Sequence, residues 1–279
     1  MERVVALKAC AETVRRHDAN RYLSALFAPA DRRPLLFALY AFNYEIARVG
    51  EVAHEPMIGA IRLEWWREVA EGARDGLPRT HSAAIGLAEL FARCAVPLDL
   101  FEALVSAREQ DAASESFATL EALEAYADAT SGGLMRIAAR VLGAGDTLDR
   151  HARTLGIAYA LAGLARAIPF HAMRGKLSLP LDMVRAEGLS REDVFAGRGR
   201  DGLKRVIAAL AERAREYLAA ARALPKAGRG LPALLPAATT RGYLKLLTRP
   251  DFDPFVTLGE TPLPHRQLAI FGAALRGRV

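Results

Sequence analysis

Two carboxylates with helical spacing are the first residues that could do chemistry. Glu64 and Glu68 lie four residues apart, with two tryptophans between them. On a helix they would share one face, as two oxygen ligands of a metal ion do. Arg62 and Arg67 alternate with them, which is the pattern of ion pairs on a helix surface. The spacing permits a metal site, but it favours salt bridges with the tryptophans as packing.

A second candidate is His171, because imidazole titrates near neutral pH and can act as an acid or a base. No Ser, Cys or Asp is spaced locally to complete a triad with it, so a structural role is favoured. Glu109 and Asp111 lie two residues apart and cannot share a helix face. We expect them to cap or solvate a helix end.

The elements that position these residues are predicted to be helices only. Alanine, leucine, arginine and glutamate outweigh valine, isoleucine and threonine, which favours an all-α fold. Prolines and glycines divide the chain into lengths typical of bundle helices. A length of 279 residues suits one large domain, 1–279, in which residues 225–279 form the last helices and a Pro/Gly-rich tail.

Two segments, residues 34–49 and 148–168, are apolar nearly all round. Helices of this kind must be buried, so both are predicted to lie at the centre of the bundle and to face each other. A cavity, if there is one, should lie between them. Residues 203–224 instead carry apolar side chains at steps of three and four, which predicts a surface helix that packs on the bundle with one face.

Charge and cysteine usage narrow the classes of partner. A net charge of +6 suits an anionic partner, but the arginines are scattered and no nucleic-acid motif appears, so no nucleic acid is expected. Cys10 and Cys94 lack metal or redox spacing and should be buried, reduced side chains.

The N-terminus lacks a signal-peptide pattern, and residues 155–170 are too short to span a bilayer. We expect a cytoplasmic protein, free or peripheral at the inner membrane surface.

Three segments together resemble one family across nearly the whole chain. Their order and spacing are similar to those of squalene and phytoene synthases. The segments are 38–42 (ALYAF), Tyr126 with Gly132, Leu134 and 140–143 (RVLG), and 174–180 (RGKLSLP). The resemblance implies a single large helical bundle of the isoprenoid (prenyl diphosphate) synthase type.

The same resemblance locates two metal-binding motifs. In that family an Asp-x-x-x-Asp pair on each of two central helices holds Mg²⁺, which ionises a prenyl diphosphate. The first pair falls here at Ala47 and Glu51, and the second at Ala167 and His171. Only Glu51 is a carboxylate, so both motifs are degenerate. The resemblance therefore implies no catalytic residue, no metal and no cofactor, with Mg²⁺ needed only if the chain is active.

One branch of the family fits better than the enzymes do. Residues 18–34 (DANRYLSALFAPADRRP), 55–59 (EPMIG) and 61–68 (IRLEWWRE) resemble a mitochondrial complex I assembly factor with this fold and its bacterial relatives. This implies a non-catalytic assembly or scaffold factor whose partners are subunits of a membrane respiratory complex.

Two alternatives remain open. The chain could be an active head-to-head prenyltransferase, provided that other carboxylates enter the cavity. It could also bind a prenyl diphosphate, an isoprenoid or an anionic lipid without turnover. In that case Arg48, Arg166 and Arg174 would replace the metal by fixed charge and bidentate hydrogen bonds.

Whether the cavity is closed or open distinguishes the scaffold hypothesis from the lipid-binding hypothesis. An empty apolar cavity costs about 24 cal/mol per Å³, so a chain without a substrate should fill it. We expect a closed or narrowed cavity, with Phe170 filling space. An open cavity with Arg48, Arg166 or Arg174 at its mouth would instead favour lipid binding.

Overall fold

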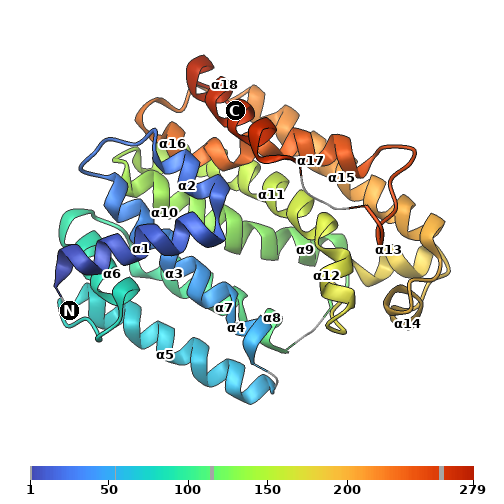
Figure 1. The fold of residues 1–279 in the computed structure, drawn as a ribbon, viewed down its shortest axis with the longest axis horizontal. Coiled ribbons are helices and arrows are strands. Elements are labelled where there is room, and N and C mark those ends of the chain that lie inside the picture. The colour runs from blue at the N-terminus through green and yellow to red at the C-terminus, as the bar shows by residue number, and fades with distance from the viewer. Residues whose placement is uncertain (1, 54, 114–115, 258–260) are drawn as a thin grey trace.

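The computed structural model describes residues 2–53, 55–113, 116–257 and 261–279. Within these ranges the chain forms helices and no strand (Figure 1), so the all-α prediction is confirmed. The first half comprises α1 (Arg3–His17), α2 (Ala19–Ala25), α3 (Arg33–Ala47), α4 (Val49–Val52), α5 (Pro56–Arg74), α6 (Ser82–Arg93), α7 (Leu98–Ala107), α8 (Glu109–Ala113), α9 (Leu120–Ala127) and η1 (Asp128–Gly132).

The second half of the chain wraps the other side of the bundle. It comprises α10 (Gly133–Val141), η2 (Gly145–Leu148), α11 (Asp149–Arg166), α12 (Ile168–Ala172), α13 (Leu181–Ala186), α14 (Arg191–Phe195), α15 (Arg200–Arg222), η3 (Gly228–Gly230), α16 (Leu231–Leu234), η4 (Leu235–Thr239), α17 (Thr240–Leu247) and α18 (Leu263–Arg276).

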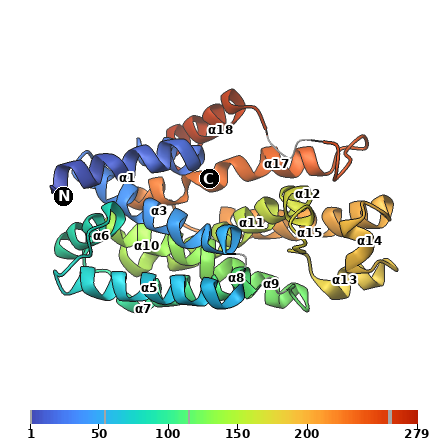
Figure 2. The same cartoon turned by 60° about the horizontal axis from the view of Figure 1, so that its bottom comes forward.

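Helices α3 and α11 occupy the middle of the molecule, as the sequence predicts. Most residues of α3 are buried, and α11 buries ten of its residues, because neither helix has a continuous polar face. In both views α11 lies between the layer that contains α17 and the layer that contains α9 (Figures 1 and 2). Side chains from both helices line one pocket, so they face each other across it.

Helix α15 packs along α11 with the side that carries Leu203, Val206, Ile207 and Leu210. This confirms the predicted surface helix. One large hydrophobic core joins these elements and extends from Cys10 on α1 to Phe252 near the end of the chain.

The C-terminal region, expected to hold the last helices and a Pro/Gly-rich tail, contains α18, a regular helix of 14 residues. Pro262 is its N-cap and Pro264 lies in its first turn, where a missing N–H costs nothing. These prolines start a helix instead of breaking one.

A close backbone contact fixes the wall beside α11. Residues Asp128–Gly132 (η1) form a π-helical turn between α9 and α10. A Cβ added at Gly156 of α11 would lie 2.5 Å from the Cα and N atoms of Gly132. Only glycine therefore allows α11 to lie this close to η1, and the contact holds Thr130 and Ser131 against the pocket.

Both cysteines are free and buried, as predicted. Burial raises the pKa of the Cys10 thiol to about 12, so the thiol stays protonated at neutral pH. Across the described ranges, each helix is too short or too polar to cross a bilayer.

Candidate functional site

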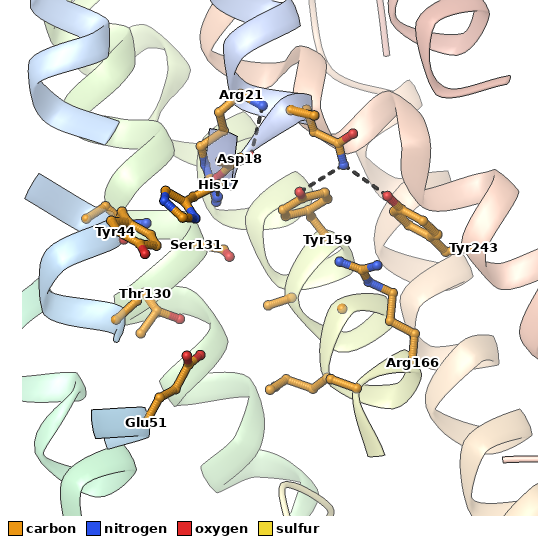
Figure 3. A pocket seen from close by; sticks show the side chains of 18 of the residues that line it. His17, Asp18, Arg21, Tyr44, Glu51, Thr130, Ser131, Tyr159, Arg166 and Tyr243 are labelled. Carbon is orange, nitrogen blue, oxygen red and sulfur yellow. Dashed lines mark hydrogen bonds and ion pairs between the residues drawn. The ribbon is translucent and has the colours of Figure 1, made fainter. Parts of the chain in front are cut away.

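A cavity of about 420 Å³ lies between α3 and α11. Its wall also receives side chains from the α1–α2 junction, α4, α9, η1, α12, α17 and α18 (Figure 3). Segments from both ends of the chain thus meet in one site. The prediction of a cavity between the two central apolar helices is confirmed. Of the expected closed or narrowed forms, the closed one is wrong, because the cavity is open.

All four motif positions line this cavity. Ala47 and Glu51 come from α3 and α4, and Ala167 and His171 come from the end of α11 and from α12, on the other side. The fold therefore places the two expected pairs opposite each other. Two methyl groups, one imidazole and one carboxylate stand at these positions.

Magnesium does not fit this set of side chains. Mg²⁺ requires oxygen ligands in near-octahedral geometry, and Glu51 is the one carboxylate at the four positions. The Lys176 ammonium lies close by, where it donates to the backbone oxygen of Gly50 and, at 2.9 Å, to that of Asp111. Within the described ranges, no group of three or more His, Cys, Asp or Glu side chains could hold a metal ion.

The three candidate arginines have different positions. Arg166 lines the cavity, with its guanidinium 4.7 Å from the ring centre of Tyr243. Arg48 turns away, pairs with Glu45 at 3.8 Å and lines a separate groove that contains both tryptophans. Arg174 lies outside the cavity. Of the three candidates, only Arg166 lines the cavity.

Phe170 does not fill the cavity, contrary to expectation. Its side chain is 37% exposed, and the Arg174 guanidinium lies 3.6 Å from the centre of its ring. In α12, Phe170 directly precedes His171 and so points about 100° away from the side chain that faces the cavity. The space between the motif helices consequently stays open.

The opposite end of the cavity contains a partly buried ion pair that was not predicted from the sequence. Asp18 caps α2 by accepting from the backbone N–H of Arg21, and its second oxygen lies 2.5 Å from the guanidinium of Arg21. That guanidinium also lies over the rings of Tyr40 and Tyr159. Burial alone would lower the pKa of Arg21, but Asp18 and Tyr159 raise it above the ordinary value.

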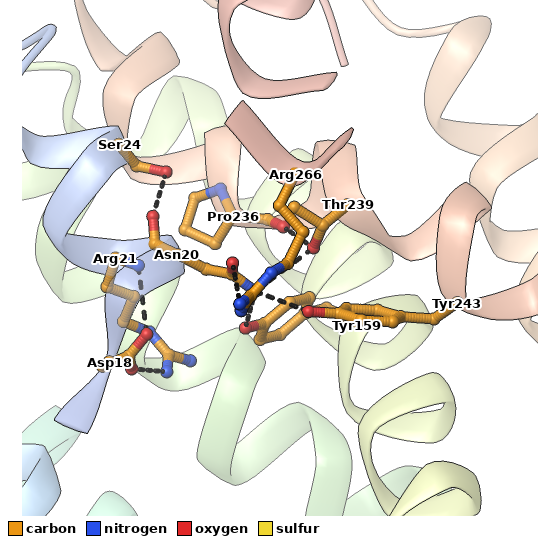
Figure 4. A network of polar contacts seen from close by, with 9 residues as sticks. All are labelled: Asp18, Asn20, Arg21, Ser24, Tyr159, Pro236, Thr239, Tyr243 and Arg266. Carbon is orange, nitrogen blue, oxygen red and sulfur yellow. Dashed lines mark hydrogen bonds and ion pairs between the residues drawn. The ribbon is translucent and has the colours of Figure 1, made fainter. Parts of the chain in front are cut away.

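Asn20 connects four helical segments at this end (Figure 4). Its Nδ2 donates to the hydroxyl oxygens of Tyr243 at 3.0 Å, Tyr159 at 3.2 Å and Thr239 at 3.4 Å. Its Oδ1 accepts from Arg266 of α18 at 3.4 Å. Asn20 is buried, so its amide supplies hydrogen bonds that water cannot supply.

A third polar cluster connects α7, α8 and α9. Tyr126 donates its hydroxyl to Asp111 at 2.7 Å and accepts from Arg108 at 2.7 Å, while Arg108 pairs with Asp111 at 3.1 Å. Asp111 therefore does more than cap or solvate a helix end, which corrects the sequence-based expectation. An Arg and an Asp three residues apart were the available signal, but the role of Tyr126 depends on the fold.

His171 has a partner that the sequence analysis did not expect. Its Nδ1 lies 2.7 Å from the hydroxyl oxygen of Ser178, because a tight turn reverses the chain after α12. Burial lowers the pKa of His171, and the cations Lys176 and Arg174 lower it further against the opposite effect of Asp111. His171 is therefore a neutral hydrogen-bonding group at neutral pH.

The carboxylate pair on α5 has the structural role that the sequence favoured. Glu64 pairs with Arg67 at 2.6 Å, and Glu68 pairs with Arg79. Arg67 also binds Glu109, so these carboxylates form a surface network. They do not line the cavity.

The described lining of the cavity contains more cations than anions. Arg21, Arg108, Arg166 and Arg266 supply four guanidinium groups, and Asp18 and Glu51 supply two carboxylates. Asn43 is buried in the wall, and its Oδ1 accepts no hydrogen bond from the described residues. Such a site can hold an anionic or polar group by fixed charge and hydrogen bonds. It lacks the carboxylates that would activate that group through a metal.

Comparison with known proteins gives the fold and the family that the sequence resemblance implies. A family model for squalene/phytoene synthase matches residues 14–267. The crystal structure of a dehydrosqualene synthase superimposes with a TM-score of 0.81 at 14% identity, covering 98% of this chain and 97% of that one. This likeness shows the fold.

Two curated relatives have different roles. NADH dehydrogenase (ubiquinone) complex I, assembly factor 6, of Homo sapiens is 32% identical, over 88% of this chain and 75% of that protein. Phytoene synthase of Thermus thermophilus is also 32% identical, over 88% of this chain and 84% of that protein. The family model spans most of the chain, and both relatives are more than 30% identical over most of it: the chain belongs to the squalene/phytoene synthase family.

Proposed function

We propose that this chain is a non-catalytic member of its family that acts as an assembly or scaffold factor for a membrane respiratory complex of the complex I type. The supporting observation is the composition of the cavity at the four motif positions, where Ala47, Ala167 and His171 leave Glu51 as the only carboxylate. Ionisation of a prenyl diphosphate by Mg²⁺ needs several such ligands.

The comparisons support the same proposal from a second direction. Relatives named complex I assembly factor 6 match over 88% of the chain, in Homo sapiens, Bos taurus and Mus musculus. Identity alone does not separate these relatives from the phytoene synthase of Thermus thermophilus, which is also 32% identical to this chain. The residues at the four motif positions of the cavity support the assembly-factor proposal.

The decisive experiment is a deletion of the gene followed by rescue. We expect less assembled complex I on native gels and a lower rate of NADH oxidation by membranes, both restored by the wild type. Glu51→Gln should restore them equally well, because a non-catalytic factor does not use this carboxylate as a ligand. Normal complex I in the deletion strain contradicts the proposal, as does failure of a folded Glu51→Gln variant.

The remaining enzyme alternative is tested on the purified protein. Farnesyl or geranylgeranyl diphosphate is supplied with Mg²⁺, and release of pyrophosphate is measured. We expect none above the background. Turnover at a typical enzymatic rate, on the order of 1 s⁻¹ or more, would establish a prenyltransferase instead.

A second candidate function is the binding of a prenyl diphosphate or a related anionic lipid without metal. The open cavity and its four guanidinium groups favour it. A ligand present at 100 times its dissociation constant stabilises a fold by about 2.7 kcal/mol, so binding in the absence of Mg²⁺ should raise the melting temperature measurably. No shift with farnesyl diphosphate or with pyrophosphate would exclude this function for these ligands.

A further inference from the structure

The outer face of α18 is apolar although it is exposed. Leu268, Phe271 and Leu275 follow one another at steps of three and four, so they form one stripe along the helix. Their exposed fractions are 69%, 52% and 73%. The opposite face of α18 buries Ile270 and Ala273 in a small core with Leu235 of η4. The helix therefore has an apolar face that the rest of the chain does not cover.

Residues from the N-terminal region extend this stripe. Leu26 and Phe27, which follow α2, are also exposed, and the ring of Phe27 lies 6.4 Å from that of Phe271. Single exposed apolar side chains are common on proteins, whereas a contiguous patch built from two distant segments marks a binding surface. We call these five residues, Leu26, Phe27, Leu268, Phe271 and Leu275, the α18 patch.

A cationic groove lies at the C-terminal end of α18. Five basic side chains line it, contributed by α15, the segment after it, α17 and the end of the chain: Arg222, Lys226, Arg241, Arg276 and Arg278. Val279 lines it too, and none of its described lining residues has a carboxylate side chain, so the groove is strongly cationic.

The charges of this groove are not neutralised by side chains from the same surface. No ion pair between its five cations and a carboxylate side chain occurs among the described residues, whereas Arg249 nearby in the sequence pairs with Asp251. Burial lowers the pKa of Arg241, and the neighbouring cations Arg222 and Arg276 lower it further. A concentration of like charge is unfavourable for the isolated fold, and an anionic partner would relieve it.

A second groove on the other side of α18 also contains cations. Arg32 and Arg229 line it together with Phe27 and Ala274, and Arg32 pairs there with Asp31 at 3.3 Å. Basic side chains therefore lie on both sides of the α18 patch. In both views α18 lies on the outer edge of the molecule, where a flat surface can reach it (Figures 1 and 2).

An anionic lipid surface matches both features, because its headgroups bind arginine and lysine and its acyl region accepts leucine and phenylalanine. A second copy of the chain fits less well, since a symmetric contact centred on this face would oppose the cationic groove to itself. The stripe is also narrow for a stable protein interface: its seven steps from Leu268 to Leu275 span about 10 Å.

We propose that α18 docks on an anionic lipid bilayer, with the α18 patch inserted at the interface and the cationic groove on the headgroups. The helix lies in the plane of the surface and does not cross it. This proposal rests on the outer surface of the molecule and is independent of the role proposed for the cavity.

Co-sedimentation of the full chain with vesicles tests the proposal. We expect binding to phosphatidylcholine vesicles that contain phosphatidylglycerol, weak binding to pure phosphatidylcholine, and loss of binding between about 0.1 M and about 1 M salt. Arg276→Gln with Arg278→Gln should weaken binding about 25-fold, at about fivefold per cation. Arg62→Gln with Arg185→Gln removes the same charge elsewhere and should weaken it much less.

The apolar part of the surface has its own variants. Leu268→Ser, Phe271→Ser and Leu275→Ser together should abolish insertion, whereas Val4→Ser with Val5→Ser changes exposed side chains on α1 and should leave binding unchanged. Circular dichroism and melting temperature confirm that each variant is folded.

Three results would overturn the proposal. The first is wild-type protein that stays in the supernatant with anionic vesicles at low salt. The second is retention on a polyglutamate resin without vesicle binding, which indicates an acidic protein partner. The third is a wild-type dimer in ultracentrifugation that the triple serine variant converts to monomer without a change in vesicle binding.

Discussion

The two ends of the cavity differ in the polar side chains that line them. At the motif end, Ala47, Glu51 and Ala167 provide one carboxylate, whose side chain is exposed. At the other end, the Asp18–Arg21 ion pair and Asn20 form a dense set of buried hydrogen bonds. One end lacks the groups that the family uses for metal chemistry, whereas the other retains a fully organised polar site.

This difference indicates that the side chains for metal chemistry and the shape of the cavity can vary independently in this fold. The motif positions lie near the ends of α3 and α11, where a substitution changes the charge but leaves the packing intact. The polar end joins α2, α11, α17 and α18, so its residues also hold the bundle together. The proposed loss of metal chemistry therefore leaves the cavity in place.

The largest expected effect is on stability, and it comes from the close backbone contact between Gly156 of α11 and Gly132 of η1. Gly156→Ala would place a Cβ 2.5 Å from the backbone of Gly132, which cannot move away without shifting η1. We expect a loss of about 3 kcal/mol in the free energy of unfolding, measured by urea denaturation.

The matched control is Gly163→Ala on the same helix, where an added Cβ meets no atom within 4 Å. This variant should gain about 0.5–1 kcal/mol, because alanine is the better helix former. Equal effects of the two substitutions would contradict the assigned contact.

The next prediction sets the two ends against each other. Asn20→Ala removes the partner of two buried tyrosine hydroxyls and of Arg266, and it should cost about 2 kcal/mol of stability. Glu51→Gln changes an exposed side chain at the motif end and should stay within about 0.5 kcal/mol of the wild type. If the Glu51 variant is the less stable of the two, the contrast between the ends is wrong.

Binding of an anion in the cavity should depend on Arg166 and not on Arg174. Arg166→Gln removes a guanidinium from the wall and should weaken binding of farnesyl diphosphate without Mg²⁺ about tenfold, or about 1.4 kcal/mol. Arg174→Gln, outside the cavity, should leave the dissociation constant unchanged. Titration calorimetry measures both, and equal weakening would place the anion elsewhere.

The smallest effect concerns pH. Burial lowers the pKa of His171, so below its ordinary value of 6.5 the unfolded chain binds a proton more readily than the folded chain. This histidine therefore makes stability fall on acidification from about pH 7.5 to about pH 5.5. In His171→Asn the fall should be smaller, as measured by urea denaturation at both values; an unchanged fall would show that His171 is not the group responsible.

The fold and the cavity could be predicted from the sequence because their causes are local. Apolar faces bury α3 and α11, and the regular spacing within each motif turns both of its positions to the cavity, Ala47 and Glu51 on one side and Ala167 and His171 on the other. The direction of each arginine could not be predicted, since it depends on the packing of the helices. Arg48 follows Ala47 by one residue and so points about 100° away from it, toward the groove beside the tryptophans.

The polar clusters were harder to predict because they too depend on the packing of the helices. Asn20 meets Tyr159 and Tyr243 across more than a hundred residues of sequence, and no spacing rule connects such positions. The start of the C-terminal helix was not placed from the sequence, because Pro262 and Pro264 resemble helix breakers until that start is known. Interactions between distant segments and the exact start of a helix are therefore what the structure adds.

Lys176 has one more consequence for how this fold behaves in a cell. Its ammonium is held by the backbone oxygens of Gly50 and Asp111 beside the motif end of the cavity. A cation that is covalently part of the chain cannot be removed by a chelator or diluted as a free ion can. The positive charge at this end therefore does not depend on the supply of magnesium, and the architecture of the site should be the same whether the surrounding magnesium is abundant or depleted.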